Sequence, residues 1–505
     1  MNSQLEILVS ELRVITQLRR VAALLSWDQE TYMPSKGAQA RADQTALILT
    51  LSHARFTGPD FRRSLAALVE LDSGEVSSDG LLPKEIRLVA MAWRDWHRAT
   101  VLPLDFVGAL AQLTSEAQQV WEEARQKNDF ARLAPYLEKI FDMKRHEADY
   151  LGFEDHPYDA LLDGYEPGMT SAQLAGLINT LRPTLVDLSA RIGDASQPGR
   201  ADALYLEYNE STQWEFGMSI LRDMGFDFTR GRQDLSAHPF TTDFHPSDVR
   251  ITTRLNANHI MVGVFSTIHE GGHALYEQAL DEKYFGTPLC EAISLGIHES
   301  QSRLWEIYVG LGRPFWEHYY PRLQGLFPDQ LGTVSLDEFY AAINSVFPST
   351  IRMDADEVTY NLHIMLRFEL EQAIMDDNIA VSDLPSLWNE GMQNYLGITP
   401  ENDTEGVLQD IHWSVGSVGY FPSYLLGNLY GCQFYNAAKA QIDGLEERIA
   451  GGDLLVLREW LRENIHQLGR GKSAAELTQD ITGQQLSAEP FVHYLEDKYR
   501  QLYGV

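Results

Sequence analysis

The sequence predicts an all-α, mainly helical protein that carries one small β-sheet near its middle. Apolar residues recur at spacings of three and four, the period of an α-helix, in segments spread along the chain to residue 466. β-branched residues, which favour strands, support a sheet only between residues 238 and 255. These two observations define the fold class.

The helical period is clearest in five segments and in a sixth near the middle of the chain. The five are residues 4–26, 139–150, 172–192, 360–376 and 443–466. The sixth, residues 262–280, also repeats apolar side chains three and four positions apart. We expect a helix in each.

The strand signal lies just before the sixth helical segment. His-Pro-Phe at residues 238–240 and the run from Asp248 to Thr253 predict one or two short strands. An edge strand at this place could hold an extended peptide through its free amides and carbonyls. An ordinary small hairpin is an equal alternative.

The breaks between helices have the composition of loops. Gly58-Pro59, Gln197-Pro198-Gly199 and Gly451-Gly452 interrupt the pattern briefly, and no internal repeat or low-complexity tract is present. We therefore expect residues 1–505 to form a single domain, with two subdomains flanking a cleft as the alternative arrangement.

The charge and the cysteine count exclude several classes of protein. A net charge of −32, from 40 basic and 72 acidic residues, argues against binding to nucleic acid or to an anionic membrane. Cys290 and Cys432 are too few for a disulfide framework, which favours a reducing compartment. The amino terminus lacks the order of a signal peptide, and no apolar run reaches about 18 residues. We expect a cytoplasmic protein.

The most informative residues are the His-Glu-Gly-Gly-His segment that begins at His269. On a helix, positions i and i+4 share a face, so His269 and His273 can offer imidazole nitrogens to one Zn²⁺, with Glu270 beside them to act on a water molecule. Inside a helix, Gly271 and Gly272 each lower helix stability by about 1 kcal/mol relative to Ala. Close approach of another backbone or of substrate would explain them, and we favour clearance for substrate above the metal.

A catalytic zinc ion takes three protein ligands, so a third must come from elsewhere. Glu299 is the best candidate, because it lies in the next helix-like segment, 26 residues after His273. His298 could compete for the metal. Adjacent helical residues point about 100° apart, so only one of the pair can readily face it.

Six signatures in this chain resemble those of the carboxypeptidase Taq family of metallocarboxypeptidases, and they occur in the family's order. They are His-Pro-Phe (238–240), Asp-x-Arg-x-Thr (248–252), His-Glu-Gly-Gly-His (269–273), His-Glu-Ser-Gln (298–301), Ile-Arg-x-x-Ala-Asp (351–356) and Gly-x-x-Gln-Asp-x-His-Trp (406–413). Similar signatures at residues 26–34 and 158–168 extend the resemblance over nearly the whole chain.

The resemblance implies a helical body with a long substrate groove, similar to the angiotensin-converting-enzyme/neurolysin-like superfamily. It implies a metal-dependent carboxypeptidase of broad specificity that releases C-terminal amino acids from peptides, and a homodimer. Zn²⁺ would be held by His269, His273 and Glu299, with Co²⁺ or Mn²⁺ as substitutes. Glu270 would be the general base and acid.

The resemblance also suggests roles for further residues of the site. The stretch after residue 406 is similar to part of the angiotensin-converting-enzyme group, which suggests that His412 and Tyr420 donate hydrogen bonds to the substrate carbonyl. A carboxypeptidase also needs a cation for the terminal carboxylate, and the planar fork of arginine suits it. Arg352 is the first candidate and Arg250 the second; either could instead form a structural ion pair with a nearby aspartate. His238 could line the groove or fix a loop.

Several alternatives remain at this stage. The chain could be a dipeptidyl or endo-acting oligopeptidase of the same superfamily, or a zinc-binding protein without turnover. Metal-bound histidines usually donate their second ring nitrogen to a carboxylate or carbonyl. Asp354, Asp356 and Asp410 are the candidates for that role.

Overall fold

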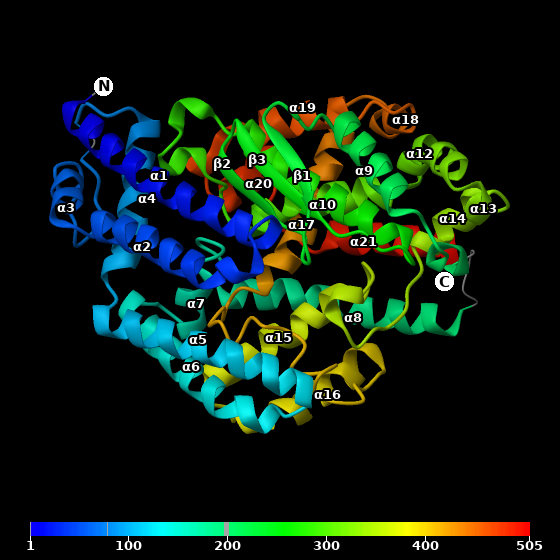
Figure 1. The fold of residues 1–505 in the computed structure, drawn as a ribbon, viewed down its shortest axis with the longest axis horizontal. Coiled ribbons are helices and arrows are strands. Elements are labelled where there is room, and N and C mark those ends of the chain that lie inside the picture. Colours follow the sequence, from blue (N-terminus) through cyan, green and yellow to red (C-terminus); the bar gives the residue numbers. More distant parts are fainter. Residues whose placement is uncertain (1, 78, 196–200) are drawn as a thin grey trace.

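The computed structural model describes residues 2–77, 79–195 and 201–505, and helices make up most of it (Figure 1). The helices before the sheet are α1 (Ser3–Thr31), α2 (Ala38–Phe56), α3 (Pro59–Ala66), α4 (Pro83–Thr100), α5 (Leu104–Lys127), α6 (Phe130–Leu151), α7 (Pro157–Leu162), α8 (Ser171–Asp194) and α9 (Glu210–Met224). The strands are β1 (Gly231–Leu235), β2 (Thr241–His245) and β3 (Asp248–Thr253).

The remaining helices follow the sheet. They are α10 (Ile260–Ala279), α11 (Leu295–Arg303), α12 (Arg313–Leu326), α13 (Pro328–Leu331), α14 (Leu336–Ile343), α15 (Tyr360–Met375), α16 (Leu384–Leu396), α17 (Pro422–Gln441), α18 (Leu445–Ala450), α19 (Leu455–Asn464), α20 (Ala474–Thr482) and α21 (Glu489–Tyr503). Short helical turns connect them: η1 (Ser35–Gly37), η2 (Ala201–Tyr205), η3 (Glu282–Tyr284), η4 (Pro288–Cys290), the π-helical η5 (Leu304–Gly310), η6 (Arg352–Asp354), η7 (Val381–Asp383) and η8 (His466–Gly471).

Five of the six predicted helices are confirmed as continuous elements: α1, α6, α8, α10 and α15. The predicted helix over 443–466 is wrong as a single element, because Gly451-Gly452 ends α18 and α19 begins four residues later. Gly452 has φ +87°, a left-handed conformation that breaks a helix. The predicted loop at Gly58-Pro59 separates α2 from α3, and the one at residues 197–199 lies outside the described residues.

The sheet has three strands in the order β1-β3-β2, one more than the upper expectation of two. β3 pairs in parallel with β1 and antiparallel with β2, so Val249 lies opposite Gly231 and Ile251 opposite Thr241. β1 was not predicted because its Gly-Arg-Gln-Asp-Leu sequence contains no β-branched residue. β2 is an edge strand that contacts α1 on one side and α10 on the other.

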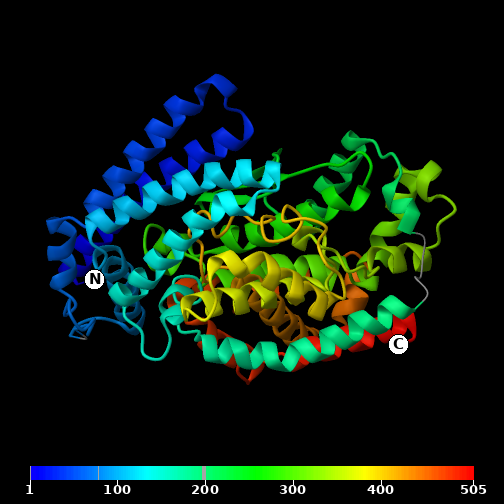
Figure 2. The same ribbon diagram turned by 90° about the horizontal axis from the view of Figure 1, so that it is seen from below.

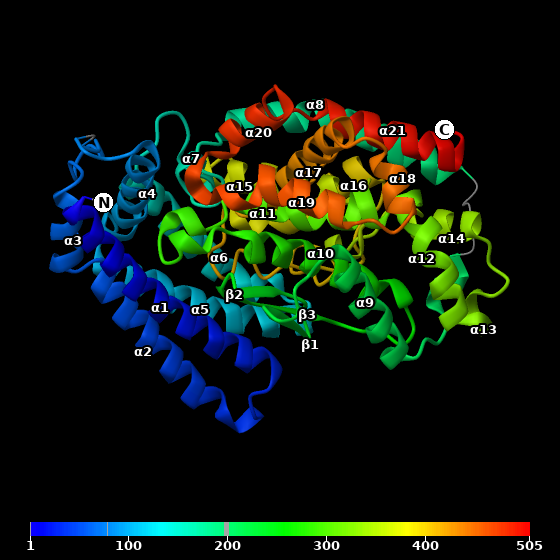
Figure 3. The ribbon, with the colours of Figure 1, turned by 90° about the horizontal axis from the view of Figure 1, so that it is seen from above.

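Two hydrophobic clusters support the body. The larger one joins α5 to α21, and the smaller one joins α1, α2, α3 and α4, where Leu8, Phe61 and Val89 are fully buried. Figure 3 shows α1 and α2 projecting together beyond the rest of the protein. The amino-terminal helices therefore form a lobe with a core of its own.

The other helices pack around α10, α11 and α17 in the centre of the fold. α8 and α21 run side by side along one face (Figures 2 and 3). The two ends of the chain lie at opposite ends of the long axis (Figure 1). Among the described residues, no helix combines the length and the hydropathy that a bilayer crossing requires.

Candidate metal centre

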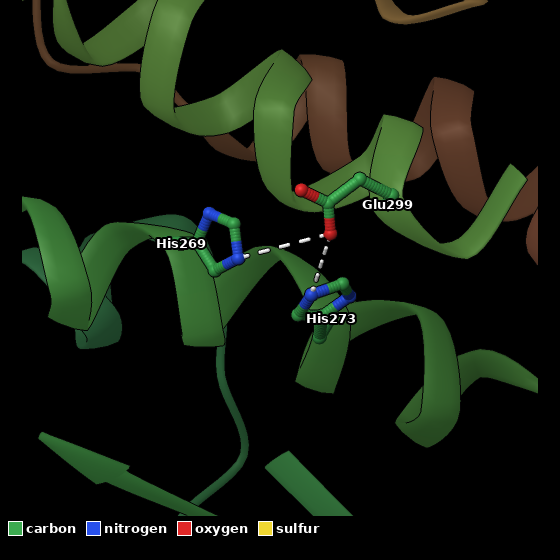
Figure 4. A group of neighbouring side chains, drawn as sticks. All are labelled: His269, His273 and Glu299. Carbon is green, nitrogen blue, oxygen red and sulfur yellow. Dashed lines mark ion pairs between the residues drawn. The ribbon is translucent and has the colours of Figure 1, made fainter. Parts of the chain in front are cut away.

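α10 presents the two histidines of the central motif on one face. Its first turn is capped by His259, whose side chain accepts a hydrogen bond from the Met261 backbone amide, and most of the helix is buried. His269 and His273 are one turn apart and point the same way (Figure 4). The helix thus supplies the two imidazoles that the sequence predicts.

α11 brings Glu299 opposite the two imidazoles. Ser294 caps this helix by accepting a hydrogen bond from the Ile297 amide. Glu299 Oε2 lies 3.4 Å from His273 Nε2 and 3.9 Å from His269 Nε2 (Figure 4). One nitrogen of each histidine and one carboxylate oxygen all lie within 4.8 Å of one another.

This donor set fits a divalent metal ion. Two imidazole nitrogens and one carboxylate oxygen are a common ligand set for catalytic metals. Burial lowers the pKa of His273 to about 3, so its ring is neutral and one ring nitrogen has a free lone pair. Burial would also lower the pKa of His269, but the charges of Glu306 and Glu299 raise it to about 9, and the same negative field favours a cation.

Glycines allow α11 to come close to both of its neighbours. A Cβ atom on Gly272 of α10 would lie 2.6 Å from the Gln301 carbonyl oxygen, and one on Gly427 of α17 would lie 2.4 Å from Glu299 Cγ. Gly272 therefore gives clearance to the α11 backbone, and the expectation that it makes room for substrate is wrong. Gly271 packs against Leu221 of α9.

Glu306, which the sequence argument missed, orients His269. Its Oε2 lies 2.7 Å from His269 Nδ1, and it belongs to the π-helical turn η5 directly after α11. Such a carboxylate partner is usual for a metal-binding histidine. A glutamate seven positions after Glu299 is the sequence signal that could have found it.

The three aspartates predicted for that role are engaged elsewhere. Asp356 accepts hydrogen bonds from the backbone amides of Val358 and Thr359, and Asp410 pairs with two arginines. Asp354 lines a cavity at the start of α10. Among the described residues, neither His269 nor His273 donates a hydrogen bond to any of these aspartates.

His298 does not join the metal-facing group. Its Nε2 lies 2.9 Å from Glu277 Oε1, and its ring stacks on His273 at 4.3 Å between centroids. The ring therefore supports His273 from the side. Of the two adjacent residues, only Glu299 belongs to the group whose nitrogen and oxygen atoms converge.

Glu270 is buried beside the ligand group. Its Oε2 accepts a hydrogen bond of 2.7 Å from Thr241 Oγ1, at the start of the edge strand β2. Burial raises the pKa of Glu270, and the charge of His269 and the bond from Thr241 oppose this. The carboxylate is thus poised to take up a proton more readily than an exposed glutamate.

His412, Tyr420 and Tyr424 form a second cluster near the ligands. The His412 ring centroid is 5.3 Å from that of Tyr420, and His412 Nε2 is 3.4 Å from the Tyr424 hydroxyl oxygen. Tyr424 was not predicted; it lies on α17, three residues before the glycine that touches Glu299. Burial lowers the pKa of His412 to about 4, so its ring is neutral at pH 7.

Arg352 is buried next to this cluster. Its Nη2 donates to Asp410 Oδ1 at 2.7 Å, and its Nη1 donates to the Tyr360 hydroxyl at 3.1 Å. The other oxygen of Asp410 lies 2.6 Å from Arg367 Nη2. One aspartate therefore holds both guanidinium groups.

The structure places the other two predicted substrate-binding residues around the sheet. Arg250 on β3 donates to Asp248 at 3.0 Å, and its guanidinium carbon lies 4.3 Å from the centre of the Trp27 ring on α1. His238 is exposed between β1 and β2, where its backbone oxygen accepts a hydrogen bond from Ser236. Neither contacts the ligand group.

Two cavities reach the residues behind His269. A cavity of about 650 Å³ follows the amino-terminal half of α10 and ends at Glu306. A smaller one of about 170 Å³ is lined by Arg303, Glu306, Glu357 and Tyr360, among others. Glu306, the carboxylate that orients His269, therefore lines both cavities.

A helical body with two helix-borne histidines, a facing glutamate and a buried glutamate beside them defines a metal-dependent hydrolase. The comparisons with known proteins agree with this class. Residues 7–499 match the family model described as carboxypeptidase Taq (M32) metallopeptidase. The chain therefore belongs to the carboxypeptidase Taq family, and it is a metallocarboxypeptidase.

Relatives match the chain over almost its full length. Thermostable carboxypeptidase 1 of Thermus thermophilus is 41% identical over 502 residues, with 97% of each chain covered. Carboxypeptidase 1 of Bacillus subtilis is 36% identical, again with 97% of each chain covered. The crystal structure of an M32 carboxypeptidase from Deinococcus radiodurans superposes with a TM-score of 0.96 at 41% identity and covers 100% of both chains.

Proposed function

We propose that this metallocarboxypeptidase uses Zn²⁺ to release C-terminal amino acids from peptides with broad specificity. The observation that carries the proposal is the convergence of His269, His273 and Glu299 beside the buried carboxylate of Glu270. Co²⁺ or Mn²⁺ could replace zinc, because imidazole and carboxylate ligands accept several divalent metals. When bound, the metal would supply a Lewis acid that polarises the scissile carbonyl and acidifies water.

Glu270 moves the proton in this proposal. Its carboxylate takes a proton from the attacking water and passes it to the nitrogen of the departing amino acid. The raised pKa that burial gives Glu270 suits both steps, because the group can then hold the proton between them. The Thr241 hydroxyl fixes the carboxylate while the proton moves.

His412 and Tyr420 are the proposed donors to the carbonyl oxygen as negative charge develops there. A neutral His412 and a protonated tyrosine can both donate a hydrogen bond at neutral pH, and burial raises the pKa of Tyr420. Tyr424 is a third candidate, because its hydroxyl lies next to His412. Burial raises the pKa of both tyrosines, and the negative charge of Glu299 adds a smaller contribution, in line with its being close to them.

Arg352 is the proposed partner of the substrate's terminal carboxylate. It lies beside the donor cluster, and its guanidinium carbon is 5.0 Å from the centre of the Tyr424 ring. Arg250 and His238 are weaker candidates, because Arg250 lies at the sheet against Asp248 and Trp27 and His238 is exposed on a loop, and neither contacts the donor cluster.

An Arg352→Ala substitution tests this assignment. We expect the preference for a free C-terminal carboxylate over a carboxamide to fall, because the amide has no charge for the arginine to recognise. Steady-state kinetics on one peptide in both forms measure the preference, with Arg250→Ala as the matched variant. A preference that is unchanged in Arg352→Ala and lost in Arg250→Ala would transfer the role to Arg250.

We further propose a single domain over residues 1–505, or two subdomains that flank a long substrate groove with the metal at its floor. This arrangement would be similar to the angiotensin-converting-enzyme/neurolysin-like superfamily. The position of β2 at the edge of the sheet supports the groove, since a peptide aligned on this strand would pass Glu270 at Thr241. A cytoplasmic homodimer completes the proposal.

One digestion experiment tests the function. A peptide of about eight residues is incubated with the zinc-loaded enzyme in three forms: with free ends, with an acetylated amino terminus and with an amidated carboxyl terminus. We expect mass spectrometry to show stepwise loss of C-terminal residues from the first two forms and little loss from the third. Release of dipeptides or internal cleavage would indicate a dipeptidyl or endo-acting peptidase. Zinc binding without chelator-sensitive cleavage would indicate a protein without turnover.

A further inference from the structure

Arg303 contacts a metal-facing glutamate and the carboxylate behind a metal-facing histidine at the same time. It is the last residue of α11, one turn after Glu299, and its side chain is 14% exposed. Its Nε donates to Glu299 Oε1 at 2.9 Å, and its Nη1 donates to Glu306 Oε2 at 3.1 Å.

The two oxygens of Glu299 are therefore divided between different partners. Oε2 faces the Nε2 atoms of both histidines, whereas Oε1 is bonded to the guanidinium. A carboxylate whose second oxygen is held in this way presents one oxygen rather than two to a cation. A ligand group of this kind keeps a coordination position free for water or substrate.

Glu306 Oε2 is shared between the same guanidinium and His269 Nδ1, at 3.1 Å and 2.7 Å. The fork of arginine can bond two carboxylates in one plane, which the point charge of lysine cannot reproduce. The guanidinium thus couples the orientation of His269 to that of Glu299.

Tyr360 fixes Arg303 from another side. The Arg303 guanidinium carbon lies 4.5 Å from the centre of the Tyr360 ring, and the Tyr360 hydroxyl accepts a hydrogen bond from Arg352. Stacking on a ring limits the planes in which the fork can lie. The Arg303 side chain is therefore restrained along both its edge and its face.

We propose that Arg303 is a positioning residue of the metal centre, which holds Glu299 as a one-oxygen ligand and keeps Glu306 behind His269. The inference rests on one part of the proposed function, namely that a metal ion binds to His269, His273 and Glu299. It predicts that the affinity and the coordination of the metal depend on a residue that does not touch the metal.

The test measures zinc binding in the absence of substrate. Competition with a chromogenic chelator gives the dissociation constant for the wild type, Arg303→Gln and Arg303→Lys. The matched control is Arg313→Gln, an exposed arginine of the next helix that pairs with Glu317 and Asp337. We expect Arg303→Gln to weaken zinc binding about 10–100-fold, as is typical for partners of metal ligands. Arg303→Lys should be intermediate and Arg313→Gln unchanged.

X-ray absorption at the zinc edge supplies a readout that a purely structural role would not change. We expect the oxygen coordination of zinc to rise in the Arg303 variants, because Glu299 Oε1 becomes free to bind. Folded Arg303 variants with wild-type affinity and coordination would overturn the proposal. If Arg303→Gln does not fold, Arg303→Lys decides by the same two measurements. A wild type that binds zinc tightly and cleaves no peptide contradicts the proposed function alone.

Discussion

At the scale of single residues, Glu270 differs from the exposed glutamates of this acidic chain in its surroundings. It is buried, it accepts a hydrogen bond from Thr241, and its raised pKa follows from the loss of solvent. A carboxylate in such a place takes up a proton more readily than an exposed one. The preceding residue along the chain, His269, belongs to the candidate ligand group, so the proposed proton acceptor and the candidate metal site are adjacent.

Replacing Glu270 with Gln should separate catalysis from metal binding. The amide keeps the size of the side chain but cannot accept a proton, so we expect kcat to fall about 10²–10⁴-fold. Zinc content should stay at the wild-type level, because Glu270 is outside the ligand group. Metal analysis and steady-state kinetics on one peptide measure both quantities.

The matched variant is Glu282→Gln, an exposed glutamate just after α10 that pairs with Arg230. It should keep wild-type kcat. A Glu270→Gln enzyme with most of its activity would remove Glu270 from the proposed proton transfer. Loss of zinc together with activity would instead indicate that Glu270 supports the metal.

The residues of the ligand group were predictable because helix geometry alone relates His269 to His273. Glu299 could be proposed from the next helical segment. Arg303, Glu306 and Tyr424 were not predicted, because their roles depend on contacts across elements that no local spacing reports. Glu306 also follows a switch from α-helix to π-helix, which changes the side that it faces.

At the scale of elements, α11 is held between α10 and α17 by glycines on both sides. Gly272 faces the α11 backbone from α10, and Gly427 faces the Glu299 side chain from α17. Small residues at such contacts let two helix backbones approach more closely than larger side chains allow. The distance between Glu299 and the two histidines therefore depends on the absence of side chains.

A Gly272→Ala substitution should push α11 away from α10. The added methyl would lie 2.6 Å from a backbone oxygen and 2.7 Å from Ser302 Cα, atoms that cannot move without the helix. We expect a loss of about 1–3 kcal/mol in the free energy of unfolding, typical of overpacking. Zinc affinity should also fall, because Glu299 moves with its helix. Urea unfolding and chelator competition measure the two effects.

Gly271→Ala is the matched control on the same helix. Its methyl would meet Leu221 Cδ2 at 2.7 Å, the end of a side chain that can rotate away. Its effect on zinc affinity should be small. Equal losses of affinity in both variants would mean that helix distortion, and not the spacing of α10 and α11, is responsible.

The loop between His412 and Tyr420 is fastened by Glu371 of α15. This buried carboxylate accepts hydrogen bonds from the Tyr158 hydroxyl at 2.7 Å, the Trp413 indole at 2.8 Å and the Gly419 amide at 3.0 Å. Trp413 follows His412, and Gly419 precedes Tyr420. Glu371 thus holds both ends of the segment that carries the proposed carbonyl donors.

Glu371 gives a testable pH dependence. Burial raises its pKa to about 7, against the lowering effect of its three donors. The native state therefore holds this proton more tightly than the unfolded chain, and the stability that the group contributes is complete at low pH and is lost as pH rises through 7. The glutamine of Glu371→Gln does not titrate. Relative to that variant, the free energy of unfolding of the wild type should fall by on the order of 3 kcal/mol between pH 4.5 and pH 8.

Urea unfolding of both proteins at several pH values measures this difference. At the low end of the range we expect Glu371→Gln to be the less stable protein, since its amide nitrogen cannot accept the Trp413 bond. The difference in the free energy of unfolding between the two proteins should narrow as pH rises. Glu390→Gln, on the exposed side of α16, should show no such trend. If the difference in the free energy of unfolding between the wild type and Glu371→Gln does not depend on pH, the raised pKa of Glu371 is contradicted.

The amphipathic helix α8 was predictable from periodicity, because it buries one continuous face, whereas α15 is buried on nearly all sides and was predictable from its apolar residues. The loop predicted at Gly451-Gly452 is confirmed as the break between α18 and α19, although the apolar period on both sides of it predicted one helix over 443–466. The order of the strands also lay beyond the sequence pattern. β1 pairs directly with β3 although β2 lies between them in the sequence, and the residues of β1 carry no strand signal.

At the scale of the whole molecule, the lobe formed by α1 to α4 is joined to the sheet by ion pairs and aromatic contacts. Arg20 of α1 pairs with Asp243 of β2 at 2.6 Å, and Trp27 stacks on Arg250 of β3. The hydrophobic cluster of the lobe also includes Leu289 of η4, and Arg94 and Arg98 of α4 pair with Asp163, so the lobe is joined to the body at several places. The Arg250 that the sequence suggested for substrate is part of this junction.

The net charge of −32 is spread over a body whose buried carboxylates are mostly paired, so the excess charge lies on the surface. Like charges on a compact surface repel one another, and unfolding moves them apart. Salt screens this repulsion, since the Debye length falls from about 30 Å at 0.01 M to about 8 Å at 0.15 M. We expect the thermal unfolding midpoint at pH 8 to rise by roughly 2 °C or more between 0.01 M and 0.2 M sodium chloride.

The same titration near pH 5 is the control for this prediction. The sequence has a pI of about 4.8, so the net charge is then small and the repulsion that salt would screen is nearly absent. Differential scanning calorimetry at both pH values should show a salt effect that shrinks toward pH 5. A midpoint that falls with salt at pH 8 would mean that attractive contacts, such as the Arg20–Asp243 pair at the lobe junction, outweigh the surface repulsion.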